Sequence, residues 1–260
     1  DSYDRMIHLV DIAEKYLQKN NAWDISLSKT VSSNRNLGLE VSKLRYLISK
    51  NAKKPYLLNL SKTELGDSFS KLTDLKKIAN QGPLTPDHVI RTKRVPMIGR
   101  DVEKYIQEYT SYFENNVQNA KESKTMLDPI PRVVIDREFG LCSIGKNMTD
   151  IGVISDIYEH TMMSILRAEK LGGFRALPAS DIFELEYWDL EQAKLKKNSS
   201  PLMFEGEVVL ITGAASGIGK SCVESFIKRG SAVIGLDVDP SIIDVSEHNN
   251  YFGMVCDLTD

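Results

Sequence analysis

The sequence predicts an α/β protein in which a mixed α/β region is followed by the first half, about three strands, of a doubly wound parallel sheet. Two observations lead to this prediction. Apolar residues recur at helical spacing in several segments, and short β-branched runs separate these segments. Near residue 200, a polar stretch precedes a change to strand, turn, helix and strand signals in that order. We therefore expect one region over residues 1–198 and a second over residues 199–260.

The first region is expected to form helices around a small sheet. The predicted helices cover residues 3–17, 37–48, 101–117 and about 150–171, and the predicted strands cover 56–60, 132–135 and 140–144. The third of these helices carries Tyr105, Tyr109, Tyr112 and Phe113 on one side. An aromatic stripe at this spacing predicts a buried helix face.

One further helix, at about residues 180–195, is predicted just before the polar stretch and is rich in charge. Tyr187 and Trp188 lie in its middle. The favoured interpretation is a domain-joining helix with both rings packed inward, and the alternative is a partner-binding surface.

A glycine-rich turn dominates the second region. The apolar run Val208–Ile211 ends in Thr212-Gly213-Ala214-Ala215-Ser216-Gly217-Ile218-Gly219, and a helix pattern follows. Gly213 permits the tight turn off the strand, Gly217 lets the backbone approach a cofactor, and Gly219 allows close packing of helix against strand. The helix amino terminus then presents free N–H groups to a pyrophosphate. This order of elements predicts a Rossmann-type dinucleotide-binding sheet.

An acidic residue ends the second predicted strand of this region. Asp237 follows the run Ala232–Leu236, where its carboxylate can accept hydrogen bonds from the adenosine ribose hydroxyls. Its charge would repel a 2′-phosphate, and no arginine lies beside it. We therefore expect NAD as the cofactor in preference to NADP.

The spacing Thr-Gly-x-x-x-Gly-x-Gly resembles that of the classical short-chain dehydrogenases, and residues 255–260 resemble that family's third strand and the turn after it. The resemblance implies that Ser216 and Ile218 touch the phosphates and that Asp257 and Leu258 line the adenine pocket. It also implies a catalytic Ser, Tyr and Lys beyond the third strand. We therefore assign no catalytic residue to this chain and expect it to be an inactive internal piece of a longer enzyme.

Three stretches of the first region, Gly82–Lys93, Pro131–Lys146 and Glu186–Leu195, resemble the bifunctional rhamnulose-phosphate aldolase/alcohol dehydrogenases. The resemblance covers nearly the whole chain. It implies a class II aldolase region fused to a short-chain dehydrogenase in rhamnose metabolism. The implied reaction is retro-aldol cleavage of a sugar phosphate, followed by NAD-dependent oxidation of a small hydroxyaldehyde or alcohol. The aldolase's zinc-binding histidines are implied to precede Asp1, so zinc is expected only in the parent protein.

Residues 85–93 contain the candidates for substrate contact. His88, Arg91 and Lys93 are suited to hold a sugar phosphate, because arginine offers a bidentate fork and lysine a point charge. The alternative is a capped helix whose cationic residues face solvent or an internal carboxylate.

Composition limits the partners and the compartment. The net charge of the 260 residues is −3, which indicates neither a nucleic acid nor an anionic membrane as partner. The three cysteines form no CxxC pattern, and no His/Cys cluster has metal-ligand spacing, so we assign no metal. A cytoplasmic location follows from this cysteine usage. The expected partners are a sugar phosphate or aldehyde and further copies of the chain in a homo-oligomer.

A second class of function stays open at this point. The chain would then be a non-catalytic scaffold or oligomerisation region with a vestigial nucleotide-binding turn. A Tyr-x-x-x-Lys motif after Asp260 in the parent protein would favour the enzyme.

Overall fold

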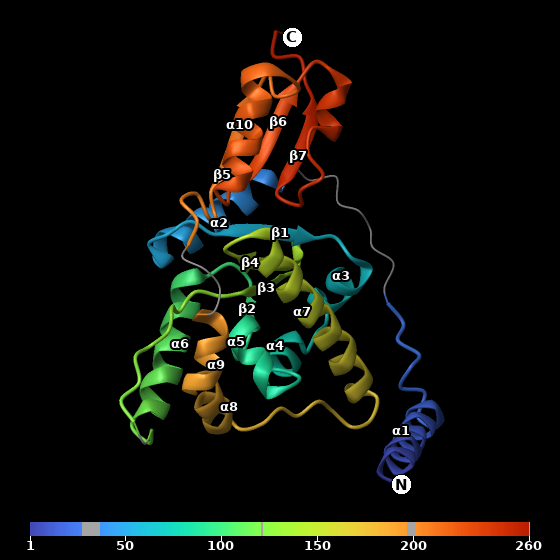
Figure 1. The fold of residues 1–260 in the computed structure, drawn as a ribbon. Helices are drawn as coiled ribbons and strands as arrows, with labels where there is room; N and C mark the ends of the chain where they lie inside the picture. The colour runs from blue at the N-terminus through green and yellow to red at the C-terminus, as the bar shows by residue number, and fades with distance from the viewer. Residues whose placement is uncertain (28–36, 121, 197–200, 260) are drawn as a thin grey trace.

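The computed structural model describes residues 1–27, 37–120, 122–196 and 201–259 (Figure 1). It confirms the predicted α/β class, because helices pack against two sheets. The predicted boundary between residues 198 and 199 lies outside the described residues. Among the helices in the described ranges, none is both long and apolar enough to cross a membrane.

The larger sheet has four strands in the order β1-β4-β3-β2. Its strands are β1 (Leu57–Ser61), β2 (Met97–Ile98), β3 (Val133–Asp136) and β4 (Gly140–Gly145). β4 pairs antiparallel with both neighbours, with Ser143 opposite Asn59 on one side and Val133 on the other. Every residue of β4 is buried, which makes this strand the centre of the fold. β2 completes the sheet by pairing parallel to β3.

Helices and short turns of helix surround this sheet. They are α2 (Gly38–Ala52), α3 (Glu64–Ser70), α4 (Leu75–Ala79), η1 (Pro86–His88), α5 (Val89–Thr92), α6 (Val102–Val117) and α7 (Met148–Glu169). One hydrophobic cluster joins α2 and α6 to the sheet, and a second joins α3, α4 and α7 to it. α1 (Ser2–Lys19) precedes them, and none of its residues is buried.

The predicted aromatic stripe on α6 is confirmed as a buried helix face. Asp101 caps this helix by accepting a hydrogen bond from the Lys104 N–H at 3.0 Å. Tyr109 and Tyr112 are buried against Phe183 and Tyr187, while Phe113 packs on the same group from its edge.

The single helix predicted at about residues 180–195 is wrong in one respect, because the structure contains two helices there. α8 (Ala179–Glu186) ends before Tyr187, and α9 (Asp189–Lys196) follows after a two-residue break. Tyr187 packs inward as expected, but Trp188 remains 47% exposed at the break. Glu186, the last residue of α8, is fully buried despite its charge.

The smaller sheet is entirely parallel, with the order β5-β6-β7. Its elements are β5 (Val208–Thr212), α10 (Gly217–Lys228), β6 (Ala232–Asp237), η2 (Pro240–Asp244) and β7 (Tyr251–Val255). α10 packs on β5 and β6 through a cluster that includes Val223, Val233 and Ile242. The three strands and the intervening helix occur in the order that the sequence predicts.

The side chain of Arg45 on α2 connects the segments that precede the two sheets. The Arg45 guanidinium donates to the Tyr56 carbonyl oxygen at 2.8 Å and to the Gly206 carbonyl oxygen at 3.0 Å. Gly206 has a positive φ of 83°, and a Cβ there would lie 2.4 Å from the Pro55 carbonyl oxygen. Only glycine fits this close approach, so the residues just before β5 lie against the residues just before β1.

Candidate functional site

The glycine-rich turn lies between β5 and α10, at the carboxyl end of β5. Gly213 and Gly217 have φ values of 62° and 53°, and a Cβ on either would enter open space. Their backbone therefore faces an unfilled region beside the amino terminus of α10. Gly219 differs, because a Cβ there would lie 2.0 Å from the Gly213 carbonyl oxygen. The three glycines thus meet the physical demands of a phosphate-binding turn, namely left-handed backbone, open approach and tight helix–strand packing.

Ser216 and Ile218 lie on the outer side of this turn. Ser216 precedes the first residue of α10 and its side chain makes no capping hydrogen bond, so the hydroxyl faces outward. Ile218 is 86% exposed, which is unusual for a large apolar side chain. Both residues are thus exposed beside the turn, and their contact with phosphate groups stays a prediction.

Asp237 ends β6 next to the same turn. Its Oδ2 accepts a hydrogen bond from the Ala215 N–H at 2.9 Å, and its Oδ1 accepts one from the Asp239 N–H at 3.1 Å. The Ala215 hydrogen bond is the main reason that the pKa of this carboxyl lies below its usual range. The charged carboxylate is thus fixed beside the turn, and each oxygen keeps a lone pair for a ribose hydroxyl.

Asp257 and Leu258 follow β7, the strand next to β6. The Asp257 carboxylate accepts hydrogen bonds from the Thr259 N–H and hydroxyl, which lower the pKa of its carboxyl. Leu258 is exposed. Asp257 and Leu258 therefore lie at the same edge of the sheet as Asp237, beyond the carboxyl end of the neighbouring parallel strand, and their contact with adenine stays a prediction.

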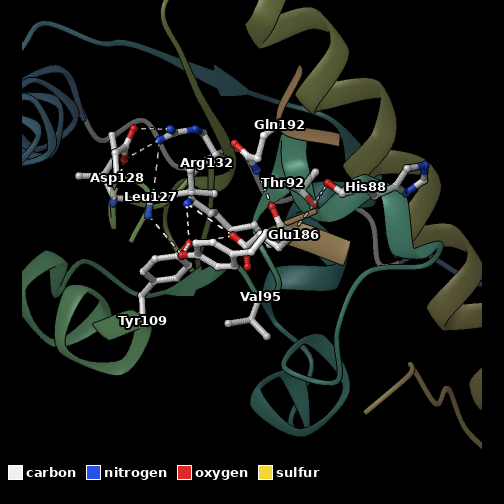
Figure 2. Close-up of polar contacts among 12 residues, drawn as sticks. His88, Thr92, Val95, Tyr109, Leu127, Asp128, Arg132, Glu186 and Gln192 are labelled. Atoms are coloured by element: carbon white, nitrogen blue, oxygen red, sulfur yellow. Dashed lines mark hydrogen bonds and ion pairs between the residues drawn. The ribbon is translucent and has the colours of Figure 1, made fainter. Parts of the chain in front are cut away.

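A buried polar cluster forms a second candidate site, inside the first region (Figure 2). The Lys93 ammonium donates to the Tyr109 hydroxyl at 3.1 Å and lies 3.7 Å from Glu186 Oε1. The Tyr109 hydroxyl donates to Glu186 Oε1 at 2.8 Å and lies 2.8 Å from the Tyr187 hydroxyl. Three segments that are distant in sequence, residues 88–94, α6 and α8, therefore meet around one ion pair.

Lys93 is held in this cluster under strain. Its backbone φ of 63° is in the left-handed region, which lysine rarely adopts. Burial lowers the pKa of its ammonium to about 8, although the neighbouring Glu186 charge opposes this decrease. A strained, buried amine of reduced basicity is a feature that clusters at functional sites.

Arg132 and Asp128 extend the cluster toward β1. The Arg132 guanidinium pairs with Asp128 Oδ2 at 2.5 Å, and the Tyr56 hydroxyl donates to the same oxygen at 2.8 Å. Burial alone would raise the pKa of the Asp128 carboxyl, but Arg132 and these hydrogen bonds lower it to about 2. The pair is therefore ionised and rigid.

The structure separates the three candidates for substrate contact. Figure 2 shows His88 directed away from Glu186 and Arg132. Burial lowers the pKa of the His88 imidazole, and its Nδ1 is buried without a hydrogen-bond partner. Arg91 is half-buried, whereas Lys93 faces the internal carboxylate of Glu186. The position of Lys93 therefore agrees with the interpretation in which a cation of this segment faces an internal carboxylate. Binding of a sugar phosphate by the three residues stays a prediction.

The sequence interpretation missed Glu186 and Arg94. Glu186 lies four and three residues beyond Ile182 and Phe183, so helical spacing places it on the buried face of α8, whereas Glu184 is exposed; this spacing is the signal that could have indicated Glu186. Arg94 follows Lys93 but points outward, with its guanidinium 5.0 Å from the Tyr112 ring centroid. Arg94 and Lys104 line an open cavity of about 650 Å³ on the outer side of α6.

The described part of the chain contains no group of three or more His, Cys, Asp and Glu side chains that could hold a metal ion. The buried cluster offers an ion pair with two tyrosine hydroxyls, and the glycine turn offers open backbone beside a helix amino terminus.

Comparison with known proteins gives matches of two kinds. The chain is similar to the uncharacterized oxidoreductase YuxG of Bacillus subtilis (strain 168), with 30% identity over 175 residues, which is 61% of this chain and 25% of YuxG. It is also similar to the short chain dehydrogenase adrF of Penicillium roqueforti, with 42% identity over 52 residues, which is 20% of each chain. A third relative is the short-chain dehydrogenase/reductase olcF of Penicillium canescens, with 36% identity over 56 residues, or 22% of each chain.

The chain thus spans about a quarter of the length of YuxG and about a fifth of the two fungal dehydrogenases. Residues 36–195, which form the larger sheet, its helices and the buried cluster, match the family described as aldolase class II, second domain. This match covers more than half of the sequence, together with all three segments that meet around Lys93 and Glu186. The chain therefore belongs to the aldolase class II second-domain family and carries, in addition, similarity to short-chain dehydrogenases.

Proposed function

We propose that this chain is part of an enzyme in which an aldolase-related region is joined to an NAD-dependent oxidoreductase of the short-chain dehydrogenase type. The aldolase-related region would cleave a sugar phosphate, as in the rhamnulose-phosphate enzymes that the sequence resembles. The oxidoreductase would then oxidise the small hydroxyaldehyde or alcohol so released. The family match and the names of the relatives support the two classes of activity, and the cofactor and substrate are our inference.

The observation that carries the dehydrogenase part is the fixed position of Asp237 beside the glycine turn. NAD, when bound, supplies the hydride acceptor. Gly213 and Gly217 leave room for its pyrophosphate, and the amino terminus of α10 offers N–H groups to it. Asp237 would hold the adenosine ribose through its two hydroxyls. A 2′-phosphate would meet the carboxylate there, so NADP should bind more weakly.

Calorimetric titration of NAD and of NADP into protein that contains these 260 residues tests the proposal. We expect saturable NAD binding that is tighter than NADP binding. Asp237→Asn should weaken NAD binding roughly 30-fold, because two ribose hydrogen bonds to a charged acceptor contribute about 2 kcal/mol. Asp244→Asn is the matched control, since Asp244 is an exposed acid at the end of η2, the turn of helix between β6 and β7.

Two outcomes would contradict the proposal. Tighter binding of NADP than of NAD would show that the Asp237 carboxylate does not meet the ribose. An absence of binding to either cofactor would favour the alternative, in which the turn is vestigial and the region serves as a scaffold.

A further inference from the structure

The open cavity on the outer side of α6 is not used by the function proposed above. It has a volume of about 650 Å³, which is within the range of small-molecule sites in proteins. One wall is an exposed face of α6 beside its buried tyrosines, where lining residues recur at helical spacing from Lys104 to Asn115. Arg94 and Ala179, the first residue of α8, form the other side.

Arg94 is held in place at the edge of this cavity. The lysine before it is buried and has a left-handed backbone, whereas Arg94 itself lies half-buried at the surface. The Tyr105 hydroxyl on α6 donates to the Val95 carbonyl oxygen at 3.0 Å, which ties this segment to the first turn of the helix. The Arg94 guanidinium lies 5.0 Å from the Tyr112 ring centroid. Because its position is restrained before a ligand arrives, the entropy cost of binding is reduced.

The cations of the cavity have no acidic partner. Among the ion pairs in the described part of the chain, none includes Arg94 or Lys104. Glu108 is the one acid among the lining residues, so the lining carries two positive charges and one negative charge. A guanidinium offers a bidentate fork to a phosphate, and an ammonium adds a point charge. This pair of cations therefore suits a phosphate group.

The rest of the lining is polar and uncharged. It consists mainly of side-chain amides and one hydroxyl, from Gln107, Ser111, Asn115 and Asn116. These groups both donate and accept hydrogen bonds, as the hydroxyls of a sugar or polyol do. Tyr112, the single aromatic residue of the lining, is buried and lies under the Arg94 guanidinium, so it offers no open ring for a nucleobase. The lining thus favours a hydroxylated organic group beside the phosphate.

We propose that this cavity binds the phosphate monoester of a small polyhydroxylated molecule, such as a sugar phosphate. Arg94 holds the phosphate oxygens through its fork, and Lys104 balances the remaining negative charge. The amides and the hydroxyl of α6 bind the hydroxyl groups of the organic part. The site is separate from the residues at 88, 91 and 93 that the sequence indicates. It adds to the function proposed above, and its test requires neither of the two activities.

Isothermal titration calorimetry with the full chain tests this binding at low ionic strength, where exposed charges are least screened. The probes are fructose 1-phosphate, inorganic phosphate and fructose. We expect saturable binding of fructose 1-phosphate with a dissociation constant of about 1 mM. Inorganic phosphate should bind at least about threefold more weakly, because it lacks the hydroxyl contacts. Fructose should show no saturable binding up to about 20 mM.

Variants locate the binding. Arg94→Gln should weaken binding of fructose 1-phosphate roughly tenfold, since it removes the charged fork. Arg137→Gln is the matched control, because Arg137 is an exposed arginine between β3 and β4 that does not line the cavity, and it should have no effect. Glu108→Gln should tighten binding about twofold, because it removes a like charge beside the phosphate. A variant that only damaged the fold would not bind more tightly, and thermal unfolding checks the fold of Arg94→Gln.

Four outcomes would overturn the proposal. They are no saturable binding of fructose 1-phosphate up to about 20 mM, inorganic phosphate that binds as tightly as the ester, fructose that binds as tightly as the ester, and undiminished binding in Arg94→Gln. An ester held at the glycine turn instead would give the last of these results. Failure of the NAD titration would leave these measurements unaffected, so the two proposals are separately testable.

Discussion

Gly219 lies at the closest approach of α10 to β5, and alanine at this position should open the smaller sheet. The added Cβ would lie 2.0 Å from the Gly213 carbonyl oxygen, 2.7 Å from its carbonyl carbon and 3.0 Å from the Ala214 Cα. All three atoms are backbone atoms. No side-chain rotation can therefore relieve the clash, and the helix itself must move.

The magnitude follows from these distances. A carbon atom normally approaches a carbonyl oxygen no closer than about 3.3 Å, so the helix must move by more than about 1 Å. Overpacking of this kind costs about 1 to 3 kcal/mol, and more where the obstacle is rigid. We expect about 3 kcal/mol, which corresponds to a roughly 100-fold increase in the local opening equilibrium of β5 and β6.

Hydrogen exchange read by mass spectrometry measures this opening in peptides that cover residues 208–212 and 232–237. Gly152→Ala is the matched control, because Gly152 lies within α7 and a Cβ there meets nothing within 4 Å. Alanine should stabilise that helix by about 0.5 to 1 kcal/mol. Unchanged exchange of β5 and β6 in Gly219→Ala, or an equal loss of protection in Gly152→Ala, would refute the reasoning.

Two further predictions concern charged groups of the buried cluster. The pKa of the Asp128 carboxyl is about 2 in the folded chain, below its ordinary value of 3.8. Its ionisation therefore adds about 2 kcal/mol to the free energy of unfolding above pH 4, and this contribution is lost as the pH falls toward 2. Urea unfolding should therefore show that Asp128→Asn lowers the free energy of unfolding by about 2 kcal/mol at pH 6 and by less at pH 3. A difference between variant and unchanged protein that does not depend on pH would contradict this. The pKa of the Lys93 ammonium is about 8, below its ordinary value of 10.5. Burial of its charge therefore lowers the free energy of unfolding fully below pH 8, and this penalty decreases as the pH rises toward 10.5. Urea unfolding should show a gain of about 1 to 2 kcal/mol from pH 7.5 to 9.5 that Lys93→Met lacks; an equal gain in that variant would exclude Lys93 as its source.

Much of the fold follows from local pattern. The parallel strands and glycine turn of the smaller sheet are predictable, because each element has a distinct periodicity and the glycines have specific backbone roles. The tyrosine stripe of α6 is likewise predictable as buried. The break between α8 and α9 is not, because residues 180–195 contain no proline or glycine to mark it. Glu186 is the last residue of α8, and its contacts with Lys93 and Tyr109 arise only in the tertiary structure.

The same limit applies to the candidate sites. Asp237 is predictable because its position at a strand end is a local property of the sequence. Lys93 is recognisable as a cation, but its inward direction depends on a left-handed backbone conformation that no local signal predicts for lysine. Trp188 was expected to pack inward with Tyr187, but Tyr187 is buried whereas Trp188 remains 47% exposed.

The attachment of the smaller sheet to the larger one has an evolutionary consequence. Arg45 holds Tyr56 and Gly206 by their carbonyl oxygens, which every amino acid possesses. The two hydrogen bonds of this attachment therefore depend on the Arg45 guanidinium and on the close approach of Gly206, which has no space for a side chain. The Tyr56 side chain is constrained separately, because its ring is buried and its hydroxyl donates to Asp128. Lineages of this protein can thus diversify the residues around the junction while the two sheets keep the same mutual orientation.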